Sequence, residues 1–316
     1  MQVADFVSGH IEQAAQIAMQ NYEEARGHVP ALPPVDAIPD LTPLAKNGLG
    51  VTAFDGDEIV GFLCVVGPFQ NAFRSTDATG IFSPMGANGA VGSKRAEVYA
   101  RMYQAAGEKW IQADASSHAV CLYAHDKEMR KRFFQYGFGL RCIDAIRPMK
   151  MLSAPPCIGY SFRELPREEY RLIFPLNKLL VEHMKNSPTF MCYPPITDSE
   201  LFKMATQPDI RYFAAEHEGQ TIAYVKIADN GENFACDDAG MINICGAYCF
   251  PEFRGTGVFQ NLINFLIQQL QLEGYVRLGV DFESINPNAY GFWPKYFEPY
   301  TNSVVRRVDE YAVRAL

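Results

Sequence analysis

The chain has 316 residues, of which 48% are hydrophobic, 20% charged and 13% aromatic, and its formal net charge is −8. This composition excludes disordered and fibrous proteins. An acidic balance without a cluster of lysine or arginine disfavours nucleic acids and anionic membranes as partners. The length favours two domains, each large enough to bury its own core.

Targeting and metal-binding features are sparse. No window approaches eighteen uninterrupted apolar residues, and Met1–Asp5 lacks the basic and apolar regions of a signal peptide. We therefore expect a cytoplasmic protein. The eight cysteines form no Cys-x-x-Cys pair, and the six histidines show no ligand spacing. These patterns predict reduced, mostly buried cysteines and no metal ion.

The first half of the chain is predicted to be an α/β unit. Apolar side chains recur at helical spacing over 9–26, and Asp55-Gly56-Asp57 between two β-type runs predicts a hairpin. The expected elements are a helix over 9–26, strands over 50–54 and 59–66, a helix over 93–113, a strand over 118–123, a helix over 126–136 and a strand that contains 140–146.

The second half repeats this order after a linker at 153–156, and the turn at 218–220 stands where 55–57 stood. Duplication explains the repeat better than chance, which predicts domains at 1–152 and 157–316. The expected elements are strands over 159–162, 210–215 and 221–227, helices over 167–185 and 198–206, a strand over 242–250, a helix over 257–273, a strand over 276–282, a helix over 287–297 and a strand over 303–306.

The most informative segment is a glycine-containing turn between a strand and an amphipathic helix. The strand ends at Pro251, the turn is Arg254-Gly255-Thr256-Gly257, and the helix buries Val258, Leu262 and Leu266. Free N–H groups and the positive dipole end at the helix start favour a bound pyrophosphate, and glycines allow the backbone to approach it closely.

In this segment the chain resembles the GNAT superfamily of acyl-CoA-dependent N-acyltransferases. The family carries Arg/Gln-x-x-Gly-x-Gly/Ala at this place, and the chain offers Arg254-Gly255-Thr256-Gly257-Val258-Phe259, with Phe259 in place of the small residue. The resemblance implies acetyl-CoA as cosubstrate. It also implies an α/β (α+β) fold of two tandem GNAT-like domains, each with a mixed, mostly antiparallel sheet flanked by helices. The residues that it places on the cofactor are Ala247, Tyr248, Cys249, Arg254, Gly255, Thr256, Gly257, Val258, Phe259, Gln260, Asn286 and Trp293.

A second motif supports the resemblance and suggests catalytic groups. Family members have an Asn after the fifth strand and a Tyr seven residues later; here Asn286 fits, but Trp293 replaces the Tyr. On a helix, Tyr290 would share the face of Asn286 and Trp293, so we take Tyr290 as the candidate acid and Tyr296, off that face, as a weaker choice.

For the base, an amine must lose a proton before it attacks the thioester, and a carboxylate can accept it. Asp281 aligns with a position where the family often has an acid, and Glu283 lies on the same strand face. Either residue can also be a solvated carboxylate at the strand end. The resemblance further implies that the backbone N–H of Cys249 or Phe250 meets the oxyanion.

The first half carries a degenerate version of these motifs. Gly86-x-x-Gly89-Ala90 is kept, but no Arg or Gln opens it, Asp126 replaces the Asn, and Phe133 stands at the Tyr position. A carboxylate disfavours an anionic cofactor and Phe cannot donate a proton, so we expect this half to be catalytically silent.

The leading hypothesis is an enzyme that moves an acetyl group from acetyl-CoA to a primary amine of a small molecule or peptide. The alternative, suggested by Trp293 and Phe259, is a CoA-binding sensor without turnover. An aminoacyl transferase that uses a charged tRNA is disfavoured by the acidic composition. The acceptor and the acyl chain length stay open, as does a homodimer.

Overall fold

The computed structural model describes residues 1–315, which fall into two compact units. Unit 1 comprises residues 1–143 and 233–235 and the C-terminal segment from Pro299 onward, and unit 2 comprises residues 144–232 and 236–298. None of the helices within residues 1–315 combines the length and the apolar composition needed to cross a lipid bilayer.

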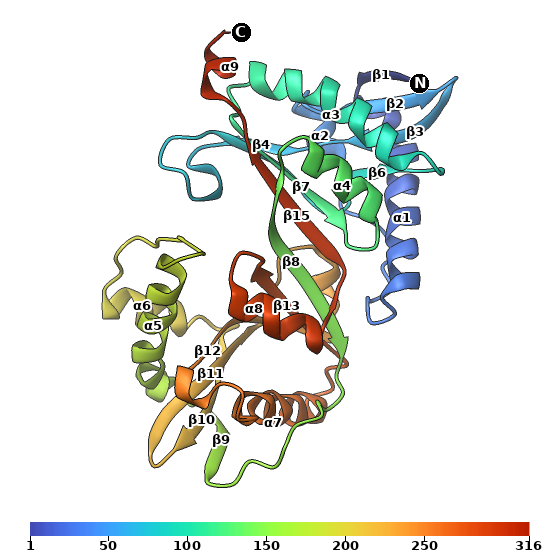
Figure 1. Cartoon of the computed structure of the whole chain (residues 1–316). Coiled ribbons are helices and arrows are strands. Elements are labelled where there is room, and N and C mark those ends of the chain that lie inside the picture. The colour runs from blue at the N-terminus through green and yellow to red at the C-terminus, as the bar shows by residue number, and fades with distance from the viewer. Residues whose placement is uncertain (316) are drawn as a thin grey trace. The chain divides into compact units, whose positions relative to one another are not determined.

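Unit 1 contains an antiparallel sheet in the order β1-β2-β3-β6 and a run of strands in the order β4-β5-β7-β15-β8 (Figure 1). Leu63 of β3 packs with α3, whereas Phe62 and Cys64 pack with α1. Successive strand residues point to opposite faces, so the two helices cover opposite faces of the sheet. The elements are β1 Gln2–Asp5, α1 Ile11–His28, α2 Thr42–Lys46, β2 Val51–Asp55, β3 Glu58–Leu63, β4 Val66–Phe69, β5 Gly80–Ser83, β6 Asn88–Ala90, α3 Arg95–Gln112, β7 Ser117–Tyr123, α4 Lys127–Gln135, β8 Gly139–Pro148, β15 Thr301–Arg307 and α9 Glu310–Ala315.

Unit 2 has strands in the order β13-β12-β11-β10-β9, antiparallel except for the parallel pair β12 and β13. Phe213 of β10 faces Phe265 of α7, and the next residue, Ala214, packs in the cluster of α5, so α5 and α7 lie on opposite faces (Figure 1). The elements are β9 Tyr160–Glu164, the 3-10 helix η3 Arg167–Ile173, α5 Phe174–Lys185, α6 Asp198–Ala205, β10 Arg211–His217, β11 Gln220–Ala228, β12 Met241–Cys249, η5 Pro251–Phe253, α7 Val258–Leu272, β13 Arg277–Glu283, α8 Pro287–Phe292 and η6 Trp293–Lys295; the short strand β14 Glu298–Pro299 has one residue in each unit.

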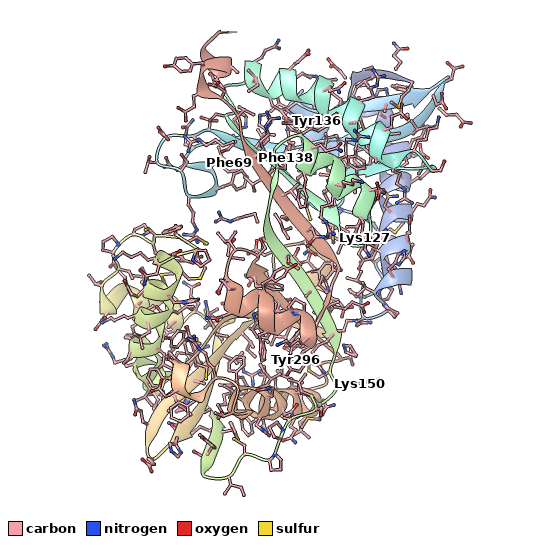
Figure 2. All side chains as sticks on the ribbon, in the orientation of Figure 1. Phe69, Lys127, Tyr136, Phe138, Lys150 and Tyr296 are labelled. Atoms are coloured by element: carbon pink, nitrogen blue, oxygen red, sulfur yellow. The ribbon has the colours of Figure 1, made fainter. Side chains whose placement is uncertain are left out.

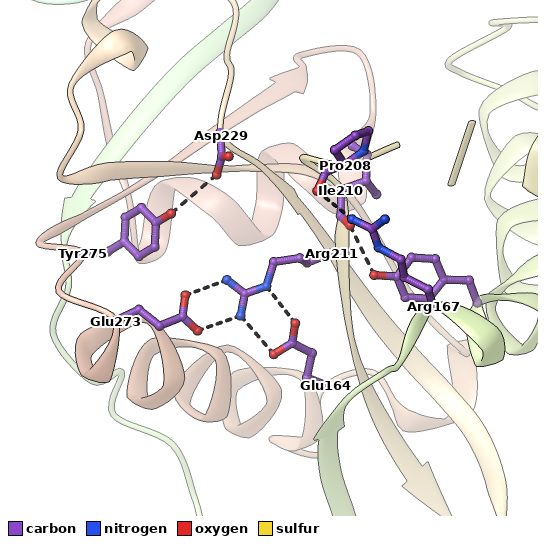
Figure 3. Close-up of polar contacts among 9 residues, drawn as sticks. Glu164, Arg167, Pro208, Ile210, Arg211, Asp229, Glu273 and Tyr275 are labelled. Carbon is purple, nitrogen blue, oxygen red and sulfur yellow. Dashed lines mark hydrogen bonds and ion pairs between the residues drawn. The ribbon is translucent and has the colours of Figure 1, made fainter. Parts of the chain in front are cut away.

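An arginine ties the end of α7 to the edge of this sheet. Arg211 of β10 donates two hydrogen bonds to Glu164 of β9, at 2.7 and 2.9 Å, and two to Glu273 after α7, at 2.6 and 2.7 Å (Figure 3). The planar guanidinium matches both carboxylates in a forked geometry, which a lysine cannot do. The network links the C-terminal end of α7 to β9 and β10.

The expected α/β fold with mixed, mostly antiparallel sheets is confirmed, whereas three predicted elements differ from the structure. The helix expected over 167–185 is α-helical only from Phe174, after η3, and the strand expected over 59–66 ends at Leu63. The predicted helix over 287–297 ends at Phe292 and continues only as η6, because Pro294 cannot donate a backbone hydrogen bond inside a helix. Tyr290, inside α8, is 52% exposed, while Trp293, in η6, is 6% exposed. The two side chains do not share the single helix face that was expected.

The two compact units do not coincide with the first and second halves of the sequence, because the last strand of each half, β8 or β15, does not lie wholly in the unit that holds most of that half. β15, from the end of the chain, belongs to unit 1 and pairs along its whole length with β7, from Thr301↔Tyr123 to Arg307↔Ser117. β8 begins in unit 1 and its last residues belong to unit 2. The division into duplicated domains at 1–152 and 157–316 stays a prediction about the sequence.

Candidate functional site

The parallel strands β12 and β13 of unit 2 separate part-way along their length. They pair as far as Ile244↔Val280, whereas β12 pairs with β11 as far as Cys249. The β11 register shifts so that Cys245 is the extra residue, and such a bulge bends its strand. Within the described residues, Gly246–Cys249 thus have a strand neighbour on the β11 side only, and their other edge is open.

The loop after β12 leads directly into α7. Gly255 and Gly257 have φ angles of +77° and +91°, a left-handed backbone that glycine adopts most readily. The hydroxyl of Thr256 donates to the carbonyl oxygen of Phe253 at 2.7 Å and closes the turn. The first N–H groups of α7 lack partners inside the helix and carry the positive dipole end. The loop therefore has the geometry of a phosphate site.

A pocket of about 410 Å³ lies beside the open strand edge and the loop. It is built entirely within unit 2, by β12, the loop, the first turn of α7, α8 with η6, and one face of α5. Its lining residues are Leu180, His183, Ala247, Tyr248, Cys249, Arg254, Gly255, Phe259, Gln260, Asn286, Pro287, Asn288, Ala289, Gly291, Phe292, Trp293, Lys295 and Tyr296.

Nine of the twelve residues predicted to hold the cofactor line this pocket, and Thr256, Gly257 and Val258 do not. A Cβ on Gly257 would lie 2.4 Å from Pro155 Cγ, so Gly257 accommodates the linker instead of facing the pocket. A Cβ on Gly255 would meet no atom within 4 Å. The structure thus brings most of the predicted set together, and their contact with a cofactor stays a prediction.

Arg254 stabilises the end of β12. Its Nε donates to the carbonyl oxygen of Cys249 at 2.9 Å, and its guanidinium carbon lies 5.3 Å from the centroid of the Tyr248 ring. A planar cation over an aromatic face is favourable, and the hydrogen bond fixes the strand end against the loop. Arg254 is otherwise exposed and borders the pocket.

Asn286 begins α8 and contacts a histidine that the sequence did not indicate. Its Oδ1 accepts the N–H of Asn288 at 3.1 Å, which is the usual role of Asn at a helix start. The same oxygen lies 3.1 Å from His183 Nε2, on α5. His183 also lines the pocket. Because 103 residues separate the pair, sequence spacing gave no sign of it.

An aromatic wall forms one side of the pocket. Phe259 packs edge-on against Phe292, at 5.1 Å between ring centroids, and against Trp293 at 6.1 Å. The Phe259 side chain, which departs from the family pattern, therefore packs against α8 and η6. Tyr296 completes the wall: its ring centroid lies 5.0 Å from that of Phe292, and its hydroxyl lies 3.3 Å from Gln260 Nε2 of α7. Figure 2 labels Tyr296 next to α8.

The two predicted catalytic residues, Asp281 and Tyr290, do not line the pocket. Asp281 is the first residue of β13 beyond the last pair with β12, at the point where the strands separate. Burial, with Glu232 and Asp144 nearby, raises the pKa of Asp281 to about 7. A carboxyl group with such a pKa can exchange a proton near neutral pH.

The environment of Cys249 disfavours a thiolate. Burial raises the pKa of its thiol to about 11, so the thiol stays protonated at neutral pH. Of the eight cysteines, Cys64, Cys121, Cys236 and Cys249 are buried, whereas Cys192 and Cys245 are exposed.

The matching region of unit 1 corrects one sequence interpretation. The supposed remnant of the phosphate loop, Gly86-x-x-Gly89-Ala90, includes a strand: Gly89 and Ala90 belong to β6 and pair with β3. A Cβ on Gly89 would lie 2.9 Å from Ile17 Cγ2, so this glycine serves close packing against α1. Only Val91–Lys94 separate β6 from α3, whereas residues 250–257 separate β12 from α7.

Comparison with known proteins agrees with the geometry. Residues 178–297 match the model of the acetyltransferase (GNAT) family. The chain contains a GNAT-family acetyltransferase domain. This domain spans α5 to η6 and includes every residue that lines the pocket, so the pocket belongs to an acyltransferase domain.

One solved structure supports the GNAT fold over nearly the whole chain. A GCN5-related N-acetyltransferase from Sphaerobacter thermophilus is 12% identical, with a TM-score of 0.56 over 96% of this chain and 95% of that one. A tandem GNAT protein from the clavulanic acid biosynthesis pathway is 13% identical, with a TM-score of 0.42 over 96% and 97%. No curated protein sequence is significantly similar to the chain.

Proposed function

We propose that unit 2 binds acetyl-CoA and transfers its acetyl group to a primary amine of a small molecule or peptide. One observation carries the proposal: the open edge of β12 at Gly246–Cys249 leads directly into a glycine loop at a helix start. An extended chain such as pantetheine can pair with an open strand edge, and a pyrophosphate suits the N–H groups of α7. The two sites follow each other along the pocket.

The direction of the backbone N–H groups selects a donor for the oxyanion. Phe250 N donates to the carbonyl oxygen of Ile222 on β11 at 3.0 Å, so this group is already used. N–H groups alternate in direction along a strand, so the N–H of Cys249 points away from β11, toward the open edge. Of the two donors that the resemblance implied, we propose Cys249, where a preformed dipole would stabilise the developing charge.

Proton transfer completes the reaction. The amine nitrogen attacks the thioester carbon, the carbon–sulfur bond breaks, the amine loses a proton and the CoA sulfur gains one. We propose that Asp281 accepts the proton, because it lies where the strands separate and its pKa is raised to about 7. For the donor, the sequence indicates Tyr290, while the position in the pocket lining favours Tyr296. The variants Tyr290→Phe and Tyr296→Phe form a matched pair that distinguishes them.

The test follows free thiol while the whole protein is incubated with acetyl-CoA and a panel of primary amines. We expect amine-dependent thiol release, and a loss of about 10²–10⁴-fold when the proton donor is changed to Phe. Tight CoA binding without thiol release for any amine would contradict the proposal and indicate a CoA sensor. Equal loss in both Tyr variants would exclude a single phenolic donor.

A further inference from the structure

Three side chains of unit 1 that could serve as metal ligands lie close together. In the sequence they are distant from the residues that line the pocket of unit 2. Glu24, His28 and His125 each offer one ligand atom, and these atoms all lie within 4.8 Å of one another. Glu24 and His28 are four residues apart on α1 and therefore share a helix face, and His125 follows the end of β7. We propose that this cluster binds a divalent transition-metal ion of the zinc type.

The orientation of His125 supports the proposal. Its Nε2 is buried and has no hydrogen-bond partner, and it lies 3.5 Å from Glu24 Oε1. A buried polar atom without a partner is rare, because it gives up its bond to water and receives nothing in return. An imidazole nitrogen is among the commonest metal ligands in proteins.

The surrounding charges orient the carboxylate and favour a cation. Arg95 contacts Glu24 Oε2 at 2.5 Å and Asp126 Oδ2 at 3.6 Å, which leaves Glu24 Oε1 directed at His125. The carboxylates of Glu24 and Asp126 and the single guanidinium of Arg95 together carry one net negative charge. His28 is the last residue of α1, where the helix dipole is also negative. A second layer that holds a ligating carboxylate is typical of metal sites.

The two imidazole rings define what must move on binding. They stack with centroids 4.4 Å apart and planes at 16°. The lone pair of an imidazole lies in its ring plane, so two stacked rings cannot both direct a nitrogen at one ion. His28 is exposed and its ring can turn, whereas the His125 side chain is only 13% exposed. Binding should therefore break the stack by rotation of His28.

The ligand chemistry selects the class of ion. Two imidazole nitrogens and one carboxylate oxygen suit Zn²⁺, Co²⁺ or Ni²⁺, and Mg²⁺ and Ca²⁺ prefer oxygen ligands alone. Three protein ligands leave a fourth position for water or another small ligand.

The experiment titrates Co²⁺ into the full chain, prepared without a histidine tag and freed of metal by a chelator. We expect visible absorption bands of low-coordinate Co²⁺ that saturate at one equivalent and disappear when Zn²⁺ is added. His125→Ala, Glu24→Gln and His28→Ala should each weaken binding by roughly tenfold to a hundredfold. Circular dichroism of each variant confirms its fold, and the exposed position of His28 makes that variant the safest of the three.

Two matched variants serve as controls. His10→Ala removes a histidine near the other end of α1, and Glu23→Gln removes the neighbouring carboxylate, which pairs with Arg26. Both should bind Co²⁺ as the wild type does. No Co²⁺ spectrum in the wild type would overturn the proposal, and so would equal weakening in the controls and the cluster variants. CoA binding by unit 2 is measured separately, so neither result depends on the other.

Discussion

Units 1 and 2 each contain a pair of parallel strands. The two units differ in what lies next to the point where the pairing ends. In unit 2, β12 and β13 pair as far as Ile244↔Val280, and the open edge that follows lines a pocket. In unit 1, β5 and β7 pair as far as Ser83↔Val120, and the Asn88 amide then donates to Ser83 Oγ at 2.9 Å and to the Cys121 carbonyl at 3.2 Å.

A buried side chain closes the end of the parallel pair in unit 1, whereas the corresponding edge in unit 2 is open. Asn88 is 5% exposed, and its Oδ1 accepts a hydrogen bond from the Tyr99 hydroxyl at 2.7 Å. The Asn88 side chain thus forms a buried bridge between β5 and β7, and both its amide nitrogen and its amide oxygen are hydrogen-bonded. The chain from β6 to α3 is also shorter than the loop from β12 to α7. Unit 1 thus differs from unit 2 at both places, and the catalytic silence of the first half stays a prediction.

The largest expected effect comes from a charge placed in the loop of unit 2. Gly255 and Gly92 both have positive φ, +77° and +82°, and a Cβ on either meets no atom within 4 Å. Asp tolerates this backbone better than most residues. Gly255→Asp should weaken CoA binding by roughly a hundredfold, about 2.7 kcal/mol, because the carboxylate repels the pyrophosphate. Calorimetric titration with CoA measures the effect.

Gly92→Asp is the matched control and should bind CoA normally, since Gly92 lies before α3 in unit 1. Gly255→Asn separates charge from size, and we expect a smaller loss than with Asp. If Gly92→Asp weakened CoA binding as much as Gly255→Asp does, the proposal that only unit 2 binds CoA would be wrong.

The buried carboxyl group at the strand separation predicts a pH dependence of stability. The pKa of Asp281 rises from 3.8 to about 7, chiefly through burial, so the folded state holds this proton more tightly than the unfolded chain does. Its contribution to stability is therefore favourable at low pH, falls as the pH rises from about 4 to 7, and is constant above. Asp281→Asn should be more stable than the wild type above pH 7, with the gain lost below pH 4.

Unit 1 offers the control for this experiment, because uncharged Cys121 follows the last parallel pair there. Cys121→Ser should change the free energy of unfolding without a pH-dependent component between pH 4 and 7. Denaturant unfolding at several pH values measures both variants. Parallel curves for Asp281→Asn and the wild type would show that the carboxyl group has an ordinary pKa.

Removing the Asn88 side chain, which bridges β5 and β7 in unit 1, should lower stability and leave acetyl transfer by unit 2 unchanged. Asn88→Ala leaves the Cys121 carbonyl and the Tyr99 hydroxyl without this partner, and each such buried group costs about 1–3 kcal/mol. Urea unfolding should show this loss, while thiol release by unit 2 stays unchanged. A loss of acetyl transfer in the folded variant would contradict the separation of roles.

We expect a small effect on stability when the residue that caps the start of α8 or of α4 is replaced. Asn286 accepts the N–H of Asn288, and Asp126 accepts the N–H of Met129 at 3.1 Å. Replacing either residue with Ala should cost about 1 kcal/mol of stability through the lost helix cap. Only Asn286→Ala should also reduce CoA binding, because Asn286 lines the pocket. Similar binding by both variants would show that Asn286 acts as a cap alone.

The sequence predicted those features that depend on neighbouring residues. The helix from Val258, the hairpin turns and the glycine loop follow from spacing and from backbone preferences over a few positions. Most of the predicted pocket residues came from the family pattern around Arg254 and Asn286. The helix end at Phe292 was also readable, because Pro294 follows it, but the aromatic spacing outweighed the proline in our interpretation.

Contacts between distant segments could not be predicted in this way. His183 meets Asn286 across 103 residues, Asn88 reaches Cys121 across 33, and β15 pairs with β7 after the rest of the chain has intervened. The interpretation of Gly89 failed for the same reason, because its neighbour Ile17 lies on α1. Local patterns do not record which faces meet in the folded protein.

Amide hydrogen exchange can show whether unit 2 alone holds the proposed acetyl-CoA site. With saturating acetyl-CoA, we expect slower exchange in peptides that contain residues 245–249 and 254–260, and no change in peptides that contain residues 86–95. Protection at residues 86–95, or no protection at residues 245–260 under saturation, would contradict the claim.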